Sequence, residues 1–284
     1  MITDYVSAGS RASSRNGGTQ DSSKNIENLI APLVRDIYSE GNTITFMSRS
    51  SQTIQQLTER VINLHYDRGC PTNSHAYILG GYVDITDRDV EQYYKLYNSK
   101  TGYTRTVRYE EVTFNYTVPE AIAKLVGEIV ASARRLREEG IRPCYATVPP
   151  ASLNKWNNYR YNRGRTAGLL HEHQYSEMEE ALTAALAIAN GVICKLNNYH
   201  CMQTPYLAGT VLRTKTDPNQ NKKYILQEHK LYDGVHAGDD LLEKWADKLH
   251  TAIRKNRTSK MAAAQTHDIP LSTPLTDTIV QSFF

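Results

Sequence analysis

The feature that most constrains the fold of this chain is its alternation of short apolar segments with longer amphipathic segments. Runs rich in apolar and β-branched residues predict strands over 43–47, 76–79, 144–148 and 191–196. Apolar residues spaced for one helical face predict helices over 53–64, 119–139, 176–189 and 239–253. Strands separated by helices are typical of a parallel sheet with helices on both faces. The sequence therefore predicts a three-layer α/β/α fold.

Two irregular ends frame this pattern. Residues 1–25 are polar, rich in Ser, Gly and Asn, and without apolar period, which predicts a disordered polar tail. Residues 26–253 carry the regular pattern and are predicted to form one domain. Residues 254–284 predict a second tail, first basic and then of low order. Inside the domain, the Tyr-rich and poorly periodic stretch 93–117 is open between a lid, a hairpin and a disordered insertion.

Composition excludes several classes of protein. With 284 residues, 40% of them hydrophobic, the chain can form one α/β domain of ordinary size. A net charge of +3 creates no strong global field for nucleic acid. The four cysteines lack CxxC spacing, no signal peptide is apparent, and no apolar run reaches the length of a membrane span. We therefore expect free thiols and an intracellular protein that uses no cofactor and no metal.

The polar residues most informative about function are Asp233 and His236, which precede the last predicted helix with Gly234 between them. In a serine hydrolase, such a carboxylate orients the imidazole, and the imidazole accepts the proton of the nucleophilic serine. Three interpretations stay open from the residues alone. The pair is a working base, a relic or ligand contact of an inactive hydrolase, or an incidental pair of structural residues.

The segment Asp233-Gly234-Val235-His236, with the helix that follows, is similar to the last block (DGxHP) of the SGNH/GDSL hydrolase superfamily. The succession of helix, Gly-Ile-Arg-Pro, strand and Pro-Pro over 134–150 also resembles that family. The resemblance extends over roughly 28–253. It implies a flavodoxin-like parallel sheet and an ester hydrolase in which Asp233 and His236 are catalytic.

The same resemblance matches the strand end at 79–86 to the family's GxND block, with Gly81 and Asp84 in their places and Val83 where the oxyanion-binding Asn belongs. It also puts Pro32 where the nucleophilic serine belongs, and Ser51 where the family has an oxyanion glycine. A proline has neither a hydroxyl nor an N–H, so it can neither attack a carbonyl nor stabilise an oxyanion.

These departures predict an SGNH-like domain that has lost serine-esterase catalysis, a pseudoenzyme acting as a binding or interaction module. SGNH-like domains also occur in proteins encoded by viruses and mobile elements, and the tailed organisation of this chain fits such a protein. The alternative is a divergent esterase or acyl hydrolase in which a relocated serine works with the retained pair. The candidate nucleophiles, which could equally be loop hydroxyls or helix caps, are Ser48, Ser50 and Ser51.

The expected ligand cleft lies at the carboxyl ends of the strands. Its candidate binding residues are Gly81, Tyr82, Asp84, Trp156 and Arg160. A small ester or carbohydrate fits such a cleft. The segment 155–165 interleaves basic and aromatic residues, which suits stacking on bases or sugars but equally an ordinary surface loop. A basic cluster could add phosphate contacts or simply be a solvated helix end: Arg254, Lys255, Arg257 and Lys260.

Overall fold

The computed structural model describes residues 1–9, 13–16, 19–39, 41–48, 52–85, 118–161, 172–216 and 222–258. Its main sheet contains four parallel strands in the order β4-β1-β5-β6. Their bounds are β1 Thr3–Ala8, β4 Thr43–Ser48, β5 Ser74–Leu79 and β6 Ile141–Tyr145. Counted along the chain, these strands lie in the order 2-1-3-4, which is the flavodoxin-like order. The predicted parallel sheet is thus confirmed.

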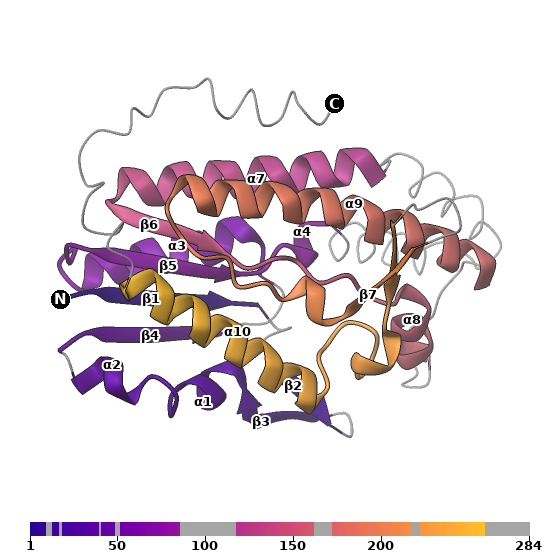
Figure 1. Ribbon diagram of the computed structural model, residues 1–284, viewed down its shortest axis with the longest axis horizontal. Coiled ribbons are helices and arrows are strands. Elements are labelled where there is room, and N and C mark those ends of the chain that lie inside the picture. The colour runs from indigo at the N-terminus through magenta and orange to yellow at the C-terminus, as the bar shows by residue number, and fades with distance from the viewer. Residues whose placement is uncertain are drawn as a thin grey trace, which may run out of the picture.

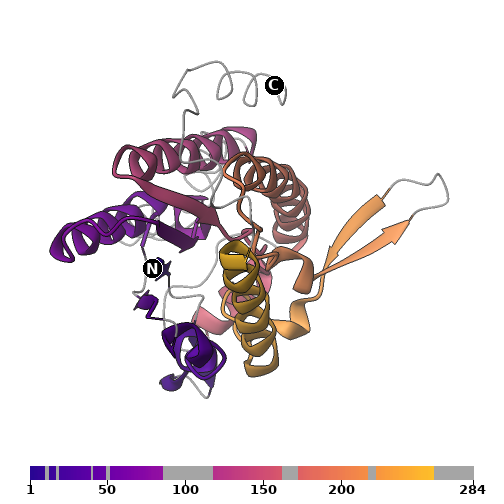
Figure 2. The same cartoon turned by 60° about the vertical axis from the view of Figure 1, so that its left-hand side comes forward.

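Helices cover both faces of this sheet (Figure 1, Figure 2). One face packs against α3 (Ile54–Asp67), α7 (Val118–Glu138) and α9 (Glu172–Tyr199). The other packs against α1 (Ile26–Ile30), α2 (Arg35–Ser39) and α10 (Asp239–Thr258). Neighbouring strand residues divide between the two layers, as a pleated strand requires: Tyr5 belongs to the first core and Val6 to the second. The three-layer α/β/α prediction is confirmed.

Shorter elements complete the described part of the chain. They are β2 (Ser13–Asn16) and β3 (Thr19–Asn25), α4 (Tyr82–Ile85), α8 (Leu153–Tyr161), η3 (Ala208–Thr210), β7 (Leu212–Thr216) and β8 (Lys222–Leu226), and η4 (Glu228–Lys230). β2 pairs with β3, and β7 with β8, as antiparallel two-stranded sheets. The stretch 93–117 and the residues after 258 lie outside the described part.

The first strand corrects the predicted N-terminal boundary. β1 lies inside the segment 1–25 that the sequence predicts as a polar tail, yet all six of its residues are buried, and two other strands pair with it. Its polar side chains have partners: the Ser7 hydroxyl donates to the Leu57 carbonyl at 3.0 Å, and the Asp4 carboxylate accepts from Arg257. The domain therefore begins at Thr3, and its last helix runs to Thr258 rather than ending at 253.

Residues 191–196, predicted as a strand, instead continue α9, which spans 28 residues. A short apolar run does not by itself distinguish a strand from a buried helical turn, and here Val192, Ile193 and Leu196 pack into the first core from one helix face. The predicted strands over 43–47 and 76–79 are confirmed as β4 and β5. The strand predicted over 144–148 begins earlier, as β6.

Candidate active site

The site lies at the carboxyl edge of the sheet, where β1 and β5 are neighbours. The chain passes from β1 to β4 on one side and then to β5 on the other, so the strand order reverses between β1 and β5. Open α/β sheets bind ligands in the crevice at such a point. There the backbone N–H of Gly9 donates to the carbonyl of Leu79 at 3.0 Å, which holds the end of β1 against the end of β5.

The loop that precedes α10 lies across this edge (Figure 1). Leu231 and Ala237, which form an isolated β-bridge, belong to the core that also contains the last residues of β1 and β5. Between them, Val235 belongs to the opposite core, together with Tyr82 and Val148. Because its residues enter both cores, the loop spans the end of the sheet and brings the predicted Asp–His pair there.

Asp233 and His236 form a buried dyad. The His236 ring nitrogen Nδ1 lies 2.7 Å from Asp233 Oδ2, and the two side chains are 5% and 0% exposed. The other oxygen, Oδ1, accepts from the backbone N–H groups of Val235 at 3.0 Å and His236 at 2.8 Å. Both carboxylate oxygens are thus engaged, which fixes the orientation of the carboxylate toward the ring.

This arrangement favours the ionised carboxylate and one tautomer of the ring. Burial raises the pKa of Asp233, but the hydrogen bond and charge of His236, together with two backbone N–H groups, outweigh it, so the pKa of the carboxyl lies below its usual value. An ionised carboxylate facing Nδ1 holds the ring proton on that nitrogen and leaves the Nε2 lone pair available. Among the described residues, the buried Nε2 atom has no hydrogen-bond partner.

Helix α8 supports the dyad from outside. The backbone N–H of Ser152 donates to the Gly234 carbonyl at 2.7 Å, and the Lys155 ammonium donates to the Leu231 carbonyl at 2.7 Å. The indole of Trp156 packs beside the imidazole of His236, with ring centroids 5.9 Å apart. The dyad loop is therefore tied to α8 along its length, and Trp156 covers one side of the base.

Gly234 allows the close contact between the loop and α8. Its φ is +94°, and a Cβ atom there would lie 2.5 Å from the Ser152 carbonyl oxygen and 2.6 Å from the Trp156 backbone nitrogen. Neither backbone atom can rotate away as a side chain would. A side chain at position 234 therefore displaces α8 or the dyad.

We expect Gly234→Ala to lower the free energy of unfolding, by about 1–3 kcal/mol from backbone strain alone, with the contact against α8 adding to it. Chemical denaturation of the full chain measures the change. Gly127→Ala is the matched control, because Gly127 lies inside α7 with nothing near its missing Cβ, and we expect a gain of about 0.5–1 kcal/mol there. Equal effects of the two substitutions would contradict this account.

The residues predicted from the GxND resemblance lie at the end of β5, where they have structural contacts. Gly81 has a φ of +104°, and a Cβ atom there would be 3.0 Å from Val148. Tyr82 is buried in the first core. The Asp84 carboxylate accepts from the Ile54 N–H, at the first residue of α3, with O–N distances of 3.1 and 3.3 Å. Burial raises the pKa of Asp84 to about 6.

Pro32 does not lie where the family resemblance puts the nucleophilic serine. Pro32 lies in the turn between α1 and α2 and not at the end of a strand, so the alignment that put a proline in the nucleophile's place is wrong. Ser48 is the exposed last residue of β4. Ser50 and Ser51 lie outside the described residues, as does the side chain of Arg160.

Sequence reasoning did not consider Ser10, a serine that directly follows Gly9 in the chain. Its own placement lies outside the described residues. Its position in the sequence, however, is the first after Gly9, the buried residue that follows β1. The polar composition of residues 1–25 concealed this strand.

Three of the basic residues that could contact phosphate have partners within the protein. Lys155 binds the Leu231 carbonyl, and Arg257 forms a buried ion pair with Asp4 at 2.6 Å. Arg254 lies 3.8 Å from Asp36. In the described ranges, no cluster of three or more His, Cys, Asp or Glu side chains could hold a metal ion. No helix of that part of the chain is long and apolar enough to cross a membrane.

No protein-family model and no curated protein matches the sequence. Solved structures show a similar arrangement of elements. A lipase/acylhydrolase from Enterococcus faecalis is 12% identical, with a TM-score of 0.45, over 90% of this chain and 97% of that chain. A putative acylhydrolase from Bacteroides fragilis is 15% identical, with a TM-score of 0.45, over 90% and 87%.

A putative lipolytic protein of the G-D-S-L family from Desulfitobacterium hafniense is 11% identical, with a TM-score of 0.46, over 89% of this chain and 99% of that chain. Likeness at this level describes a shared layout of strands and helices and says nothing of an activity. Each of these three structures matches about 90% of this chain.

Proposed function

We propose that this protein is a serine-type ester hydrolase in which His236 is the general base, Asp233 orients it, and Ser10 is the nucleophile. The observation that carries the proposal is the buried Nε2 atom of His236. It has no partner among the described residues, while Nδ1 on the other side of the ring is held by a carboxylate 2.7 Å away. Leaving a buried polar atom unpaired costs stability, so such an atom indicates a partner that comes with the reaction.

Ser10 is proposed from its place in the chain. Gly9 is fixed at the carboxyl edge by its hydrogen bond to Leu79, and the next Cα atom lies about 3.8 Å further along. In the family that the sequence resembles, the nucleophile follows the first strand in a G-D-S context. Ala8-Gly9-Ser10 keeps the serine of that context and changes the two residues before it. This position supports Ser10 over Ser48, which ends the edge strand β4.

In the proposed reaction, Nε2 of His236 accepts the hydroxyl proton of Ser10 as its oxygen attacks the ester carbonyl. The imidazolium that forms is stabilised by the Asp233 carboxylate, and it then protonates the leaving alcohol. A water molecule, activated by the same base, releases the acid from the serine. The dyad is held rigidly by α8, so little reorganisation is needed during the transfer.

Val83 stands where the family resemblance expects an oxyanion donor, so we expect the enzyme to be slow. The same residue supports a second candidate function, a binding module without catalysis. A valine side chain cannot donate a hydrogen bond where the family resemblance expects an asparagine. Losing one oxyanion donor lowers kcat by about 10²–10³-fold. Formation of a covalent adduct is therefore a better test than turnover, because a slow hydrolase still accumulates the adduct.

The test is labelling of the full chain with a fluorophosphonate probe, with the modified residue identified by peptide mass spectrometry. We expect labelling of the wild type at Ser10, none in Ser10→Ala, and a rate lowered at least about 100-fold in His236→Ala. Ser48→Ala is the matched control and should label like the wild type, since Ser48 is a serine at the end of a neighbouring strand.

Modification at Ser48, Ser50 or Ser51 would overturn the assignment of Ser10 and favour a relocated nucleophile. Absence of labelling in a folded wild-type protein, together with absence of ester turnover, would overturn the hydrolase and leave the binding module.

A further inference from the structure

The two-stranded sheet of β7 and β8, here called the ribbon, stands out from the body of the molecule (Figure 2). Its strands pair in register from Leu212 opposite Leu226 to Thr216 opposite Lys222. Residues 213–216 are all exposed. The ribbon lies outside both hydrophobic cores except at its base, where Leu212 and Leu226 pack against the second core. Packing in a hydrophobic core therefore does not explain the projecting part of the ribbon.

The ribbon and the segment that joins its two strands together carry a charge equal to the net charge of the whole protein. Residues 212–226 contain four basic residues and one acidic residue, a net charge of +3, which equals the net charge of the full chain. The remaining residues sum to zero. The basic residues of the ribbon are Arg213, Lys215, Lys222 and Lys223.

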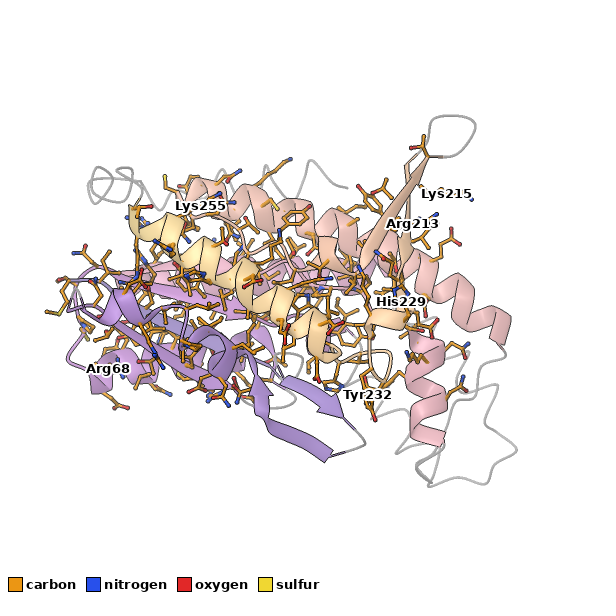
Figure 3. The ribbon with its side chains drawn as sticks, turned by 60° about the horizontal axis from the view of Figure 1, so that its bottom comes forward. Arg68, Arg213, Lys215, His229, Tyr232 and Lys255 are labelled. Carbon is orange, nitrogen blue, oxygen red and sulfur yellow. The ribbon has the colours of Figure 1, made fainter. Side chains whose placement is uncertain are left out.

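Two of these charges, Arg213 and Lys215, lie on one face of the ribbon. Arg213 and Lys215 are two residues apart on β7, and the backbone register places Lys223 directly opposite Lys215. Figure 3 shows Arg213 and Lys215 together on the ribbon. Like charges directly opposite one another disfavour the pairing of two strands. Among the described residues neither Arg213 nor Lys215 has an ion pair, so the repulsion points to an anionic partner outside the chain.

We propose that the ribbon is a binding arm for double-stranded nucleic acid, which enters a groove and neutralises backbone phosphates. The shape of the ribbon favours this occupant. The major groove of a duplex is about 12 Å wide and about 8.5 Å deep, and it admits a two-stranded β-ribbon. A five-residue strand extends about 17 Å, enough to cross the groove with the charged face toward one wall.

The chemistry of the exposed residues fits phosphate contacts. A duplex carries one negative charge for about every 1.7 Å of its axis, so several phosphates lie within reach of a ribbon that carries several cations. Thr214 and Thr216, exposed on the same strand, provide hydroxyl groups of the kind that donate to phosphate oxygens. Because the rest of the chain is neutral in sum, binding is expected to be moderate and strongly dependent on salt.

Three neutralised phosphates predict a slope of about −2.7 for log K against log salt concentration. Affinity should then fall about 40-fold between 50 and 200 mM salt. The measurement is fluorescence anisotropy of a labelled duplex that is titrated with the full chain at several salt concentrations. The duplex has about 24 base pairs, which is roughly two helical turns.

The test variant is Arg213→Gln/Lys215→Gln. We expect its slope to be about −0.9 and its affinity at 50 mM salt to fall by about 10-fold or more. The matched control is Arg68→Gln/Lys248→Gln, which also removes one arginine and one lysine. Both control residues are exposed; Arg68 lies away from the ribbon in Figure 3, and Lys248 lies on α10. The control should keep the wild-type slope, and circular dichroism should show that both variants are folded.

The proposal is overturned if the wild type does not bind the duplex at 50 mM salt, or if the control loses as much affinity as the ribbon variant. It is also overturned if single-stranded DNA or polygalacturonate binds as tightly as the duplex, because the ribbon would then be a site for an acidic polymer of another kind. None of these readouts needs ester hydrolysis, so the result is independent of whether Ser10 is labelled.

Discussion

Replacing Asp4 by alanine is expected to lower the free energy of unfolding by about 3–5 kcal/mol. Asp4 is fully buried, and its Oδ2 accepts from the Arg257 guanidinium at 2.6 Å. Its other oxygen lies 3.1 Å from Nδ1 of His75. Without the carboxylate, the guanidinium of Arg257, only 7% exposed, becomes a buried cation with no counter-charge. Urea denaturation followed by circular dichroism measures the loss.

Two further variants separate this effect from that of an ordinary ion pair. Arg254 lies 3.8 Å from Asp36, and both side chains are more than half exposed. Arg254→Ala should therefore cost at most about 1 kcal/mol. The double variant Asp4→Ala/Arg257→Met removes the cation as well and should be more stable than Asp4→Ala alone. If Asp4→Ala costs no more than Arg254→Ala, the buried cluster does not hold the fold together as we describe.

The cluster closes the fold at the edge of the sheet opposite the dyad. Asp4 lies near the start of β1, His75 near the start of β5, and Arg257 in the last turn of α10. The hydrogen bond from Arg257 to Asp4 joins residues 253 positions apart. The amino edge thus contributes stability, while the carboxyl edge carries the candidate chemistry.

Whether an element depends on local or on distant contacts decides whether it could be predicted from sequence. The alternation of apolar strands and amphipathic helices is a local signal, and it predicts three of the four strands of the main sheet, β4, β5 and β6, together with α3, α7 and α10. β1 could not be recognised in this way. Its residues Thr3, Asp4 and Ser7 read as polar, and they are buried only because partners far along the chain satisfy them.

The candidate site was also predictable only where its residues are close together in the sequence. Asp233 and His236 are close in sequence, and a glycine between them allows the turn that joins them, so the dyad follows from local spacing. The proposed nucleophile, Ser10, lies more than 200 residues earlier in the chain. Its assignment depends on β1, whose polar residues predict a tail, and without β1 the family resemblance puts Pro32 in the place of the serine. A strand that cannot be recognised from local sequence therefore also hides the residue that follows it.

Asp233→Asn is expected to lower the rate of ester hydrolysis, and of fluorophosphonate labelling, by about 10⁴-fold while leaving the fold intact. The amide oxygen of asparagine can still accept from the backbone N–H groups of Val235 and His236. The amide N–H₂ then faces Nδ1, which must become an acceptor. The ring proton moves to Nε2, and the base can no longer accept a proton from the nucleophile. Stopped-flow or extended-time labelling measures the rate.

The matched control is Asp36→Asn, which makes the same chemical change at a carboxylate that is more than half exposed and far from the dyad in the sequence. It should react like the wild type. The two rates together test the orientation of the base rather than its presence, because His236 remains in both variants. If Asp233→Asn reacts within about tenfold of the wild type, the carboxylate does not set the tautomer of His236. The buried Asp233 carboxylate would then only stabilise the loop, through the hydrogen bonds that it accepts from the two backbone N–H groups.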